Sequence, residues 1–155
     1  MRYAAILSPL GPLTLFEDEG ALVAIEFGSA GGGASSPLLE DAVQQLHAYF
    51  DARLEVFPLP LAPRGTPFQQ KLWKRLSSIP YGEVRCYGEL ARSLGVSARS
   101  VGRGCGANPI PIVIPCHRVV AAGGRLGGYS GGDGPATKRA LLALEGAALD
   151  AGNAA

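Results

Sequence analysis

The sequence predicts an α+β protein: a small N-terminal antiparallel β-sheet domain with one helix, followed by a mostly helical domain that contains a helix-turn-helix. Short alternating apolar segments fill the first 27 residues. From residue 37 onward, apolar residues recur mainly at helical spacing, and glycines and prolines separate the segments. The 155 residues are enough for one domain or two small ones with a substantial core.

The N-terminal segments are predicted to form a β-meander. RYAAILS (2–8) and LTLF (13–16) flank a Pro-Leu-Gly-Pro turn, and ALVAIEF (21–27) follows an EDEG turn. The stretch GSAGGGASS (28–36) has no side chains suited to packing, so it predicts a flexible linker or loop tip.

A helix opened by Pro37 is expected next. Its apolar residues follow one another at spacings of four, three and four: Leu39, Val43, Leu46 and Phe50. A short strand, LEVFP (54–58), is expected after it. A stiff proline-rich connector (58–63) then indicates the domain boundary. We therefore expect a supporting domain (1–62), a second domain (63–150) and a disordered tail (151–155).

The second domain begins with helix signals. Thr66 suits an N-cap, Pro67 the first helical position and Gln69 the return half of a capping box. An apolar stripe follows, and Pro80 is expected to end the helix; the stripe is Phe68, Leu72, Leu76 and Ile79. A closing helix is expected near the C-terminus, with Pro135 early, Leu141 and Leu144 facing inward and Gly146 as its stop.

The segment CYGELARSLGVSARSVG (86–102) fits a helix-turn-helix, a pattern that any tight helix pair can imitate. The residues that fit it are Leu90, Ala91, Leu94, Gly95, Val96 and Val101. The second helix holds three glycines, each of which costs roughly 1 kcal/mol relative to alanine. Its small residues suit close approach to a DNA minor groove, with Arg99 projecting from the helix start. The alternative is a poorly formed turn packed on the core.

Charge is distributed unevenly along the chain. Residues 1–63 hold two basic and eight acidic residues, a net of −6, and residues 64–118 hold nine basic and two acidic, a net of +7. The remaining residues balance at three each. This division favours contact between the middle of the chain and a polyanion, although a solvated basic face is the alternative.

Composition narrows the class of protein. Hydrophobic content of 47% and charged content of 17% are typical of a soluble globular protein. No apolar run of 18 residues predicts a membrane span, and prolines and glycine interrupt the N-terminus before a signal-peptide core forms. Three widely spaced cysteines without a C-x-x-C pair favour free thiols, a reducing cytoplasm and no structural metal. The glycine-rich segment 121–134 lacks a phosphate-loop Lys-Ser pair, so no nucleotide site is expected.

The segment NPIPIVIPCHRVV (108–120) places Cys116 beside His117 in a stiff, apolar setting. Cysteine reacts as a thiolate, and a nearby base promotes its formation. Because adjacent side chains diverge, we expect a water to bridge the pair and a carboxylate to hold the imidazole, with Glu145 as the candidate. From composition alone, a buried structural Cys-His pair is an equal alternative.

These motifs resemble the O6-alkylguanine-DNA alkyltransferase family. The resemblance rests on PCHRV preceded by NPIPIVI and followed by GGYSGG, on FQQKLWKRLSSIPYGEVRCYGELA and on LLALEG. It covers residues 66–146 closely and the N-terminal SPLGPLTL more loosely. The resemblance implies single-turnover repair, in which the protein irreversibly takes an alkyl group from a flipped guanine, and possible action on O4-alkylthymine. It implies a monomer that binds alkylated double-stranded DNA through the minor groove, with no cofactor and no metal.

The resemblance also implies a role for each matching residue. Cys116 would accept the alkyl group, His117 would act as base through water and Glu145 would orient it. Asn108 would brace the active-site turn, and Tyr87 would donate a proton to the guanine ring. Arg99 would fill the gap left by the extruded base. Pocket-lining residues would be Pro111, Val119, Tyr129 and Ser130, and DNA-contacting residues would be Ser97, Ala98, Arg99, Ser100, Gly102 and Arg103.

The chain departs from the family pattern in its DNA-facing segment. LGVSARS is about two residues shorter than the usual spacing, and Ser100 replaces a common alanine. Gly104-Cys105-Gly106 adds a second thiol near the expected groove-facing surface.

Two other classes of protein remain as alternatives. A helix-turn-helix regulator or non-catalytic binder of alkylated DNA would use the same basic segment without the chemistry. A cysteine hydrolase would use Cys116, His117 and Glu145 with repeated turnover, although its nucleophile and base are not normally chain neighbours.

Overall fold

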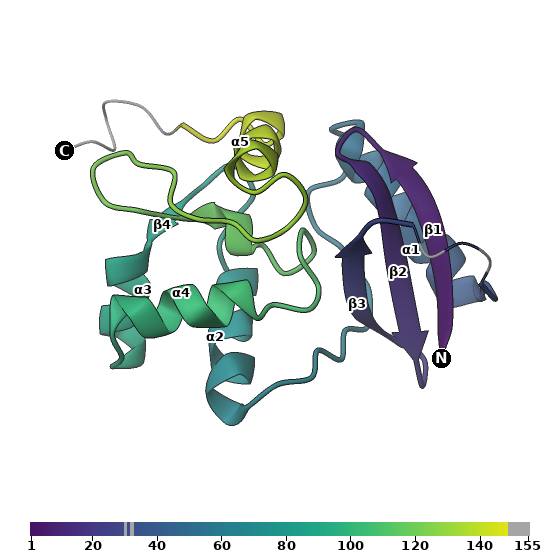
Figure 1. Cartoon of the computed structure of the whole chain (residues 1–155), viewed down its shortest axis with the longest axis horizontal. Coiled ribbons are helices and arrows are strands. Elements are labelled where there is room, and N and C mark those ends of the chain that lie inside the picture. The colour runs from purple at the N-terminus through teal and green to yellow at the C-terminus, as the bar shows by residue number, and fades with distance from the viewer. Residues whose placement is uncertain (30, 32, 149–155) are drawn as a thin grey trace. The chain divides into compact units, whose positions relative to one another are not determined.

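The computed structural model describes residues 1–29, 31 and 33–148, which form two compact units (Figure 1). The first holds Met1–Arg64 together with Pro109–Pro111, and the second holds Gly65–Asn108 and the described residues from Ile112 onward. The predicted tail lies outside the described residues, as do residues 30 and 32 of the predicted linker. A three-stranded sheet precedes a region rich in helices, so the predicted α+β class is confirmed.

An antiparallel sheet forms the first unit and confirms the predicted meander. Strands β1 (Arg2–Ser8), β2 (Gly11–Asp18) and β3 (Ala21–Phe27) lie side by side in chain order. At the two turns, Gly11 and Gly20 have φ values of 97° and 78°. Glycine adopts these left-handed values without a Cβ clash, so both turns can stay tight.

Helix α1 (Pro37–Phe50) packs on this sheet, and the predicted helix is confirmed. The Ser36 hydroxyl caps it by accepting a hydrogen bond from the Leu39 N–H at 3.1 Å. Its buried face differs in part from the prediction. Ala42 is buried in place of Val43, and Tyr49 is buried in place of Phe50. Spacings of three and four residues both keep a side chain on one helix face, so either neighbour satisfies the pattern.

The strand predicted at 54–58 is wrong, because these residues form bends and irregular backbone. Backbone pairing with β3 occurs further along, where the Leu22 N–H donates to the Pro60 carbonyl and the Ala62 N–H donates to the Leu22 carbonyl, both at 2.9 Å. The prolines of this segment have no N–H to donate, which limits the pairing to one bridge.

Helix α2 (Pro67–Ser77) begins the second unit with the predicted capping box. The Thr66 hydroxyl accepts a hydrogen bond from the Gln69 N–H at 3.1 Å, and the Gln69 side chain accepts one from the Thr66 N–H at 2.9 Å. The helix ends at Ser77, three residues before the predicted stop at Pro80. Its fully buried face is Leu72, Trp73 and Leu76.

Helices α3 (Tyr87–Leu94) and α4 (Ala98–Gly106) form the predicted helix-turn-helix. Gly95 ends α3 with a φ of 68°, the left-handed conformation common at helix C-termini. The Ser97 hydroxyl caps α4 by accepting a hydrogen bond from the Ser100 N–H at 3.1 Å. Because α4 is a regular helix, the alternative of a poorly formed turn is wrong.

The glycines of α4 have different surroundings. Gly104 is buried, and a Cβ there would lie 2.3 Å from Leu72 Cδ2. Its carbonyl accepts a hydrogen bond from the Trp73 indole at 2.9 Å. A Cβ at Gly102 would meet nothing within 4 Å. Gly104 therefore allows close packing on α2, whereas Gly102 leaves open space on the other side of α4.

Two short strands join the start of α3 to the Cys-His-Arg segment. Strand β4 (Arg85–Cys86) pairs in parallel with β5 (Val119–Val120), and the register places Arg85 opposite Val119. The 3₁₀ turn Cys116–Arg118 comes directly before β5, and Tyr87 comes directly after β4. This ladder therefore joins the chain segment that leads into α3 to the segment that follows the Cys116 turn.

Helix α5 (Pro135–Leu144) confirms the predicted closing helix. Leu141 is buried as expected, but the second buried leucine is Leu142, and Leu144 is only half-buried. Gly146 follows the helix with a φ of 71°, consistent with its predicted place at the helix stop. No helix in the described ranges is long and apolar enough to cross a membrane.

Candidate active site

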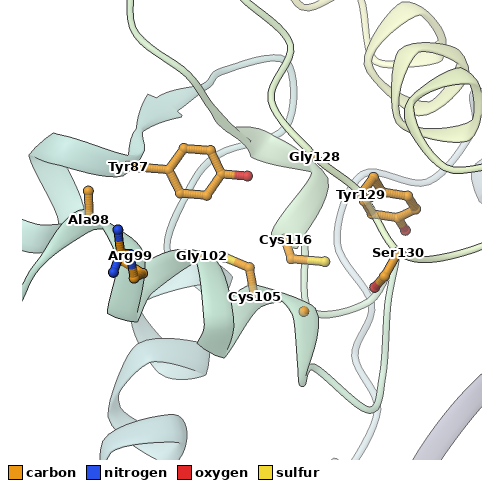
Figure 2. Close-up of a pocket in the computed structure, with 10 residues that line it drawn as sticks. Tyr87, Ala98, Arg99, Gly102, Cys105, Cys116, Gly128, Tyr129 and Ser130 are labelled. Atoms are coloured by element: carbon orange, nitrogen blue, oxygen red, sulfur yellow. The ribbon is translucent and has the colours of Figure 1, made fainter.

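A cavity of about 710 Å³ opens beside Cys116 within the second unit. Figure 2 shows the Cys116 side chain between α4 and the Tyr129–Ser130 segment, with the Tyr87 hydroxyl pointing across from the start of α3. The volume of the cavity lies in the range of pockets that bind small organic molecules. The residues that line it are Tyr87, Ala98, Arg99, Gly102, Cys105, Gly106, Cys116, Gly128, Tyr129 and Ser130.

The loop before Cys116 is held by Asn108. Its side-chain amide donates a hydrogen bond to the Ile114 carbonyl at 2.8 Å, which closes the base of the loop. Within the loop, Ile112 is almost fully buried and has a φ of 75°, an unusual value for a β-branched residue. Proline and this strained residue leave the segment before Cys116 few alternative conformations.

A buried hydrogen-bond network holds the His117 imidazole through its Nε2 atom. His117 Nε2 and Glu145 Oε2 are 2.8 Å apart, and both side chains are fully buried. Arg118 donates to both carboxylate oxygens, from Nε to Oε1 at 2.8 Å and from Nη2 to Oε2 at 3.0 Å. A carboxylate only accepts hydrogen bonds, so Nε2 carries the imidazole proton and Nδ1 has the lone pair. No described residue gives His117 Nδ1 a hydrogen-bond partner.

Burial sets the protonation of this group of residues. Desolvation raises the pKa of the Cys116 thiol, and the Asn108 side chain and Lys138 oppose this shift. Burial lowers the pKa of His117 despite its bond to Glu145, so the imidazole is neutral near pH 7. Burial also raises the pKa of the Tyr87 phenol to about 12. At rest, the site therefore holds a thiol, a neutral base and a protonated phenol.

The structure brings most of the predicted site residues together. Tyr87, Arg99, Cys116, Tyr129 and Ser130 line the cavity, as do Ala98 and Gly102 from the predicted DNA-contacting set. His117, Glu145 and Asn108 do not line the cavity. Glu145 binds His117, the chain neighbour of Cys116, and Asn108 binds the loop that precedes Cys116.

The other predicted residues do not line the cavity. Val119 is fully buried and offers its carbonyl to Lys138, while Pro111 groups with the first unit. Ser97 and Ser100 form the cap of α4, and Arg103 lines a separate small hollow near the start of α2.

Three residues of the site were not among the predicted site residues. Arg118 has no predicted role, yet it binds both oxygens of Glu145. Cys105 was noted as an unusual thiol and proves to line the cavity. Lys138 was not singled out, although its spacing from Leu141, Leu142 and Glu145 places it on the buried face of α5. Within the described residues, no three His, Cys, Asp or Glu side chains are grouped as metal ligands would be.

Comparison with known proteins assigns both parts of the chain to one family. Residues 1–63 match the model described as "6-O-methylguanine DNA methyltransferase, ribonuclease-like domain". Residues 67–147 match "6-O-methylguanine DNA methyltransferase, DNA binding domain". The cysteine-centred cavity beside a helix-turn-helix fits a class of DNA-acting alkyl acceptors. The chain belongs to the 6-O-methylguanine DNA methyltransferase family.

Individual relatives agree with this assignment. The chain is 46% identical to a methylated-DNA--protein-cysteine methyltransferase of Mycobacterium bovis, over 94% of this chain and 92% of that protein. It is 42% identical to the protein of the same name from Methanosarcina acetivorans, over 94% of this chain and 99% of that protein. Its structure is similar to that of Mycobacterium tuberculosis OGT in complex with DNA, with a TM-score of 0.83, 47% identity and coverage of 93% and 92%.

Proposed function

We propose that this protein repairs double-stranded DNA directly by transferring an alkyl group from O6-alkylguanine to its own Cys116, once per molecule. The observation that carries the proposal is the Cys116 thiol at the wall of a 710 Å³ cavity, directly before the neutral, carboxylate-held His117. The names of the relatives support the same activity.

The chemistry begins with removal of the Cys116 proton. Because burial raises the pKa of this thiol, the reactive thiolate needs a base. His117 Nδ1 accepts the proton through a water, and the Glu145 carboxylate stabilises the imidazolium that forms. The thiolate then attacks the alkyl carbon, a carbon–sulfur bond forms and the bond to the guanine oxygen breaks.

The departing guanine takes the electron pair of the broken bond. Tyr87 lines the cavity and donates its phenolic proton to the guanine ring, so the base leaves neutral. Asn108 holds the turn before Cys116, and Tyr129 and Ser130 form the wall on the opposite side from α4 (Figure 2). Val119 does not line the cavity, and in this proposal it contributes through its carbonyl, which accepts a hydrogen bond from Lys138. The transfer step needs no cofactor or metal, because the Cys116 sulfur itself accepts the alkyl group.

A guanine stacked in a duplex is out of reach, so the reaction requires base flipping. The α4 residues exposed to solvent are small or basic, which suits insertion into the minor groove. Arg99 lies at the cavity and fills the gap left by the flipped base. The groove contacts come from Ser97, Ala98, Ser100, Gly102 and Arg103.

We also propose that the protein acts as a monomer in the cytoplasm, where its three free cysteines stay reduced.

Intact mass spectrometry tests this proposal directly. The protein is mixed with excess duplex DNA that contains O6-methylguanine, and peptide mapping locates the added group. We expect one methyl group per protein, attached to Cys116, and an equal loss of methylguanine from the DNA. Cys116→Ser should gain nothing, whereas Cys105→Ser should still be methylated at Cys116.

Two results would contradict the proposal. Repeated turnover without a stable adduct would indicate a hydrolase. DNA binding without any loss of methylguanine would indicate a non-catalytic binder.

A further inference from the structure

Cys105 is a second thiol in the cavity, and the reaction proposed above makes no use of it. It is half-buried, projects from α4 and lines the cavity together with Cys116 (Figure 2). Gly102 and Gly106, three residues before it and one residue after it, line the same wall. Neither glycine has a side chain, so the Cys105 sulfur is the group that this turn of α4 presents to a molecule in the cavity.

A short series of hydrogen bonds ties the two cysteines to each other. The Asn108 N–H donates to the Cys105 carbonyl at 3.2 Å, and the Asn108 side-chain amide donates to the Ile114 carbonyl at 2.8 Å. The Cys116 N–H donates to the same carbonyl at 2.8 Å. The end of α4 and the turn that holds Cys116 are therefore fixed to one another through Asn108 and Ile114.

The charge of one thiol affects the other. Burial raises the pKa of Cys105 to about 12, and negative charge on Cys116 contributes to this rise. A Cys116 thiolate therefore keeps Cys105 protonated, so one sulfur at a time is a nucleophile. An alkyl group on Cys116 removes that negative charge, because a thioether is neutral, and Cys105 then ionises more easily.

We propose that Cys105 is a second alkyl acceptor, which captures the far end of a bifunctional adduct after Cys116 has captured the near end. The substrate class is O6-(2-haloethyl)guanine in duplex DNA, whose second carbon carries a leaving group. The inference rests on the proposed function and extends it to lesions with two reactive carbons. A flexible two-carbon arm on Cys116 lies in the cavity that Cys105 also lines, so the arm reaches Cys105 without contact between the two sulfurs.

The bonds balance in two steps. In the first, the Cys116 sulfur bonds to the carbon attached to the guanine oxygen, and that carbon–oxygen bond breaks as proposed above. In the second, the Cys105 sulfur bonds to the carbon that carries the halogen, and the halide leaves with the electron pair of the broken bond. Two sulfurs joined by an ethylene bridge remain in the cavity.

The proton of the second step has an acceptor in the site. The first step leaves Tyr87 as a phenolate, and Tyr87 and Cys105 both line the cavity. Burial raises the pKa of each of them to about 12, so transfer of the Cys105 proton to the Tyr87 oxygen is close to balanced. His117 then releases to water the proton that it took from Cys116. The net products are unmodified guanine, a halide ion, one proton and the bridged protein.

The test uses duplex DNA that contains O6-(2-chloroethyl)guanine, mixed with the protein as soon as the lesion has formed. Intact mass should show that most of the protein gains an ethylene group and loses two hydrogens, with no chlorine retained. We expect about a tenfold excess over the hydroxyethyl product of attack by water, because intramolecular attack has a high effective concentration. Unfolding in acid stops the reaction before analysis, since both thiols are then protonated.

Peptide analysis locates the bridge. Trypsin leaves both cysteines on one peptide, because the chain has no lysine or arginine between Arg103 and Arg118. In the bridged peptide, neither cysteine should react with iodoacetamide. A single backbone break between Cys105 and Cys116 should release no separate fragments, since the bridge still joins the two parts.

Two variants are matched to each other. Cys105→Ser replaces the second sulfur by a group of similar size, and its product should stop at a chloroethyl or hydroxyethyl group on Cys116. Cys86→Ser removes the third cysteine, which does not line the cavity, and should form the bridge like the wild type. Uptake of a methyl group from methylguanine-containing duplex shows that each variant is folded, and Cys105→Ala replaces Cys105→Ser if the latter takes up none.

Three results would overturn the proposal. The first is a wild type that ends with a hydroxyethyl group on Cys116 and a free Cys105. The second is an ethylene bridge that still forms without the Cys105 sulfur, and the third is a wild type that becomes cross-linked to the DNA through Cys116. Failure of the proposed function would appear separately, as a wild type that gains no methyl group from methylguanine.

Discussion

Glu145 determines which ring nitrogen of His117 is available as a base. It accepts the Nε2 proton and is itself bound at both oxygens by Arg118, whose Nη1 also donates to the Ile79 carbonyl at 2.6 Å. The carboxylate therefore has two functions. It orients the imidazole, and it balances a guanidinium that is almost fully buried.

Glu145→Gln removes the negative charge of this side chain and keeps its packing, because the two side chains have nearly the same shape. We expect alkyl transfer to slow by about 10²-fold or more, since the imidazolium loses its negative partner. The unfolding free energy should fall by about 3–5 kcal/mol, because buried Arg118 loses its counter-charge. Single-turnover kinetics and denaturant unfolding measure the two effects.

The matched control is Glu83→Gln. Glu83 forms an exposed ion pair with Arg85 at 3.1 Å, and such pairs contribute about 0–1 kcal/mol. A Glu145→Gln protein with the stability and rate of this control would show that the buried network is not needed.

Residue identities indicate the proposed nucleophile more readily than the residues that support it. Cys116 and His117 are chain neighbours in a distinctive motif, and Glu145 ends a recognisable helix, so each could be predicted. Lys138 could not be found in the same way, because a lysine at a helix start usually faces solvent. Only its spacing from Leu141, Leu142 and Glu145 indicates an inward position. The bidentate contact of Arg118 depends on two segments meeting, which no local pattern specifies.

At the scale of elements, α4 is a regular helix although several of its residues are glycines. Gly104 and Gly102 are only two residues apart, yet one faces α2 and the other faces the cavity. The same substitution at these positions should therefore have opposite effects on stability.

Gly104→Ala should destabilise the protein by about 1–3 kcal/mol, because its Cβ would overlap buried Leu72. Gly102→Ala should stabilise it by about 0.5–1 kcal/mol, because alanine favours a helix and meets nothing there. The added methyl group should nevertheless weaken DNA binding or slow transfer, since Gly102 lines the cavity. Chemical denaturation and a DNA-binding titration check both expectations. Equal stability changes at the two positions would contradict the packing described for α4.

The elements themselves were largely predictable, since their signals are local. The capping box of α2 and the left-handed Gly95 depend on a few adjacent residues. The wrong strand at 54–58 has a physical cause as well, because apolar residues favour a strand while nearby prolines remove its donors. The two-residue pairing of β4 with β5 joins segments more than 30 residues apart, so no local pattern predicts it.

At the scale of the whole chain, acidic and basic residues separate along the sequence. Residues 1–63 have a net charge of −6 and residues 64–118 a net of +7, and the helix-turn-helix belongs to the basic part. Binding to DNA by the basic part releases counterions from phosphates, so affinity should depend on salt.

We expect duplex affinity to fall about 10²-fold between roughly 50 and 200 mM salt if about four phosphates are neutralised. Fluorescence anisotropy with labelled duplex measures this dependence. Arg103→Gln, at an exposed position of α4, should reduce the slope by about one. Arg53→Gln, an exposed residue of the first unit, should leave it unchanged. Salt-independent binding would contradict this account of the basic segment.

The parallel pairing of β4 with β5 has a consequence for altering what the protein accepts. Backbone pairing joins the segment that continues into Tyr87 to the segment that follows the Cys116 turn, so changes in either strand would affect both sides of the site. The opposite wall, Gly128 to Ser130, lies in a loop that the ladder does not include. An engineer seeking room for bulkier adducts should therefore diversify that loop and keep residues 85–87 and 116–120 intact.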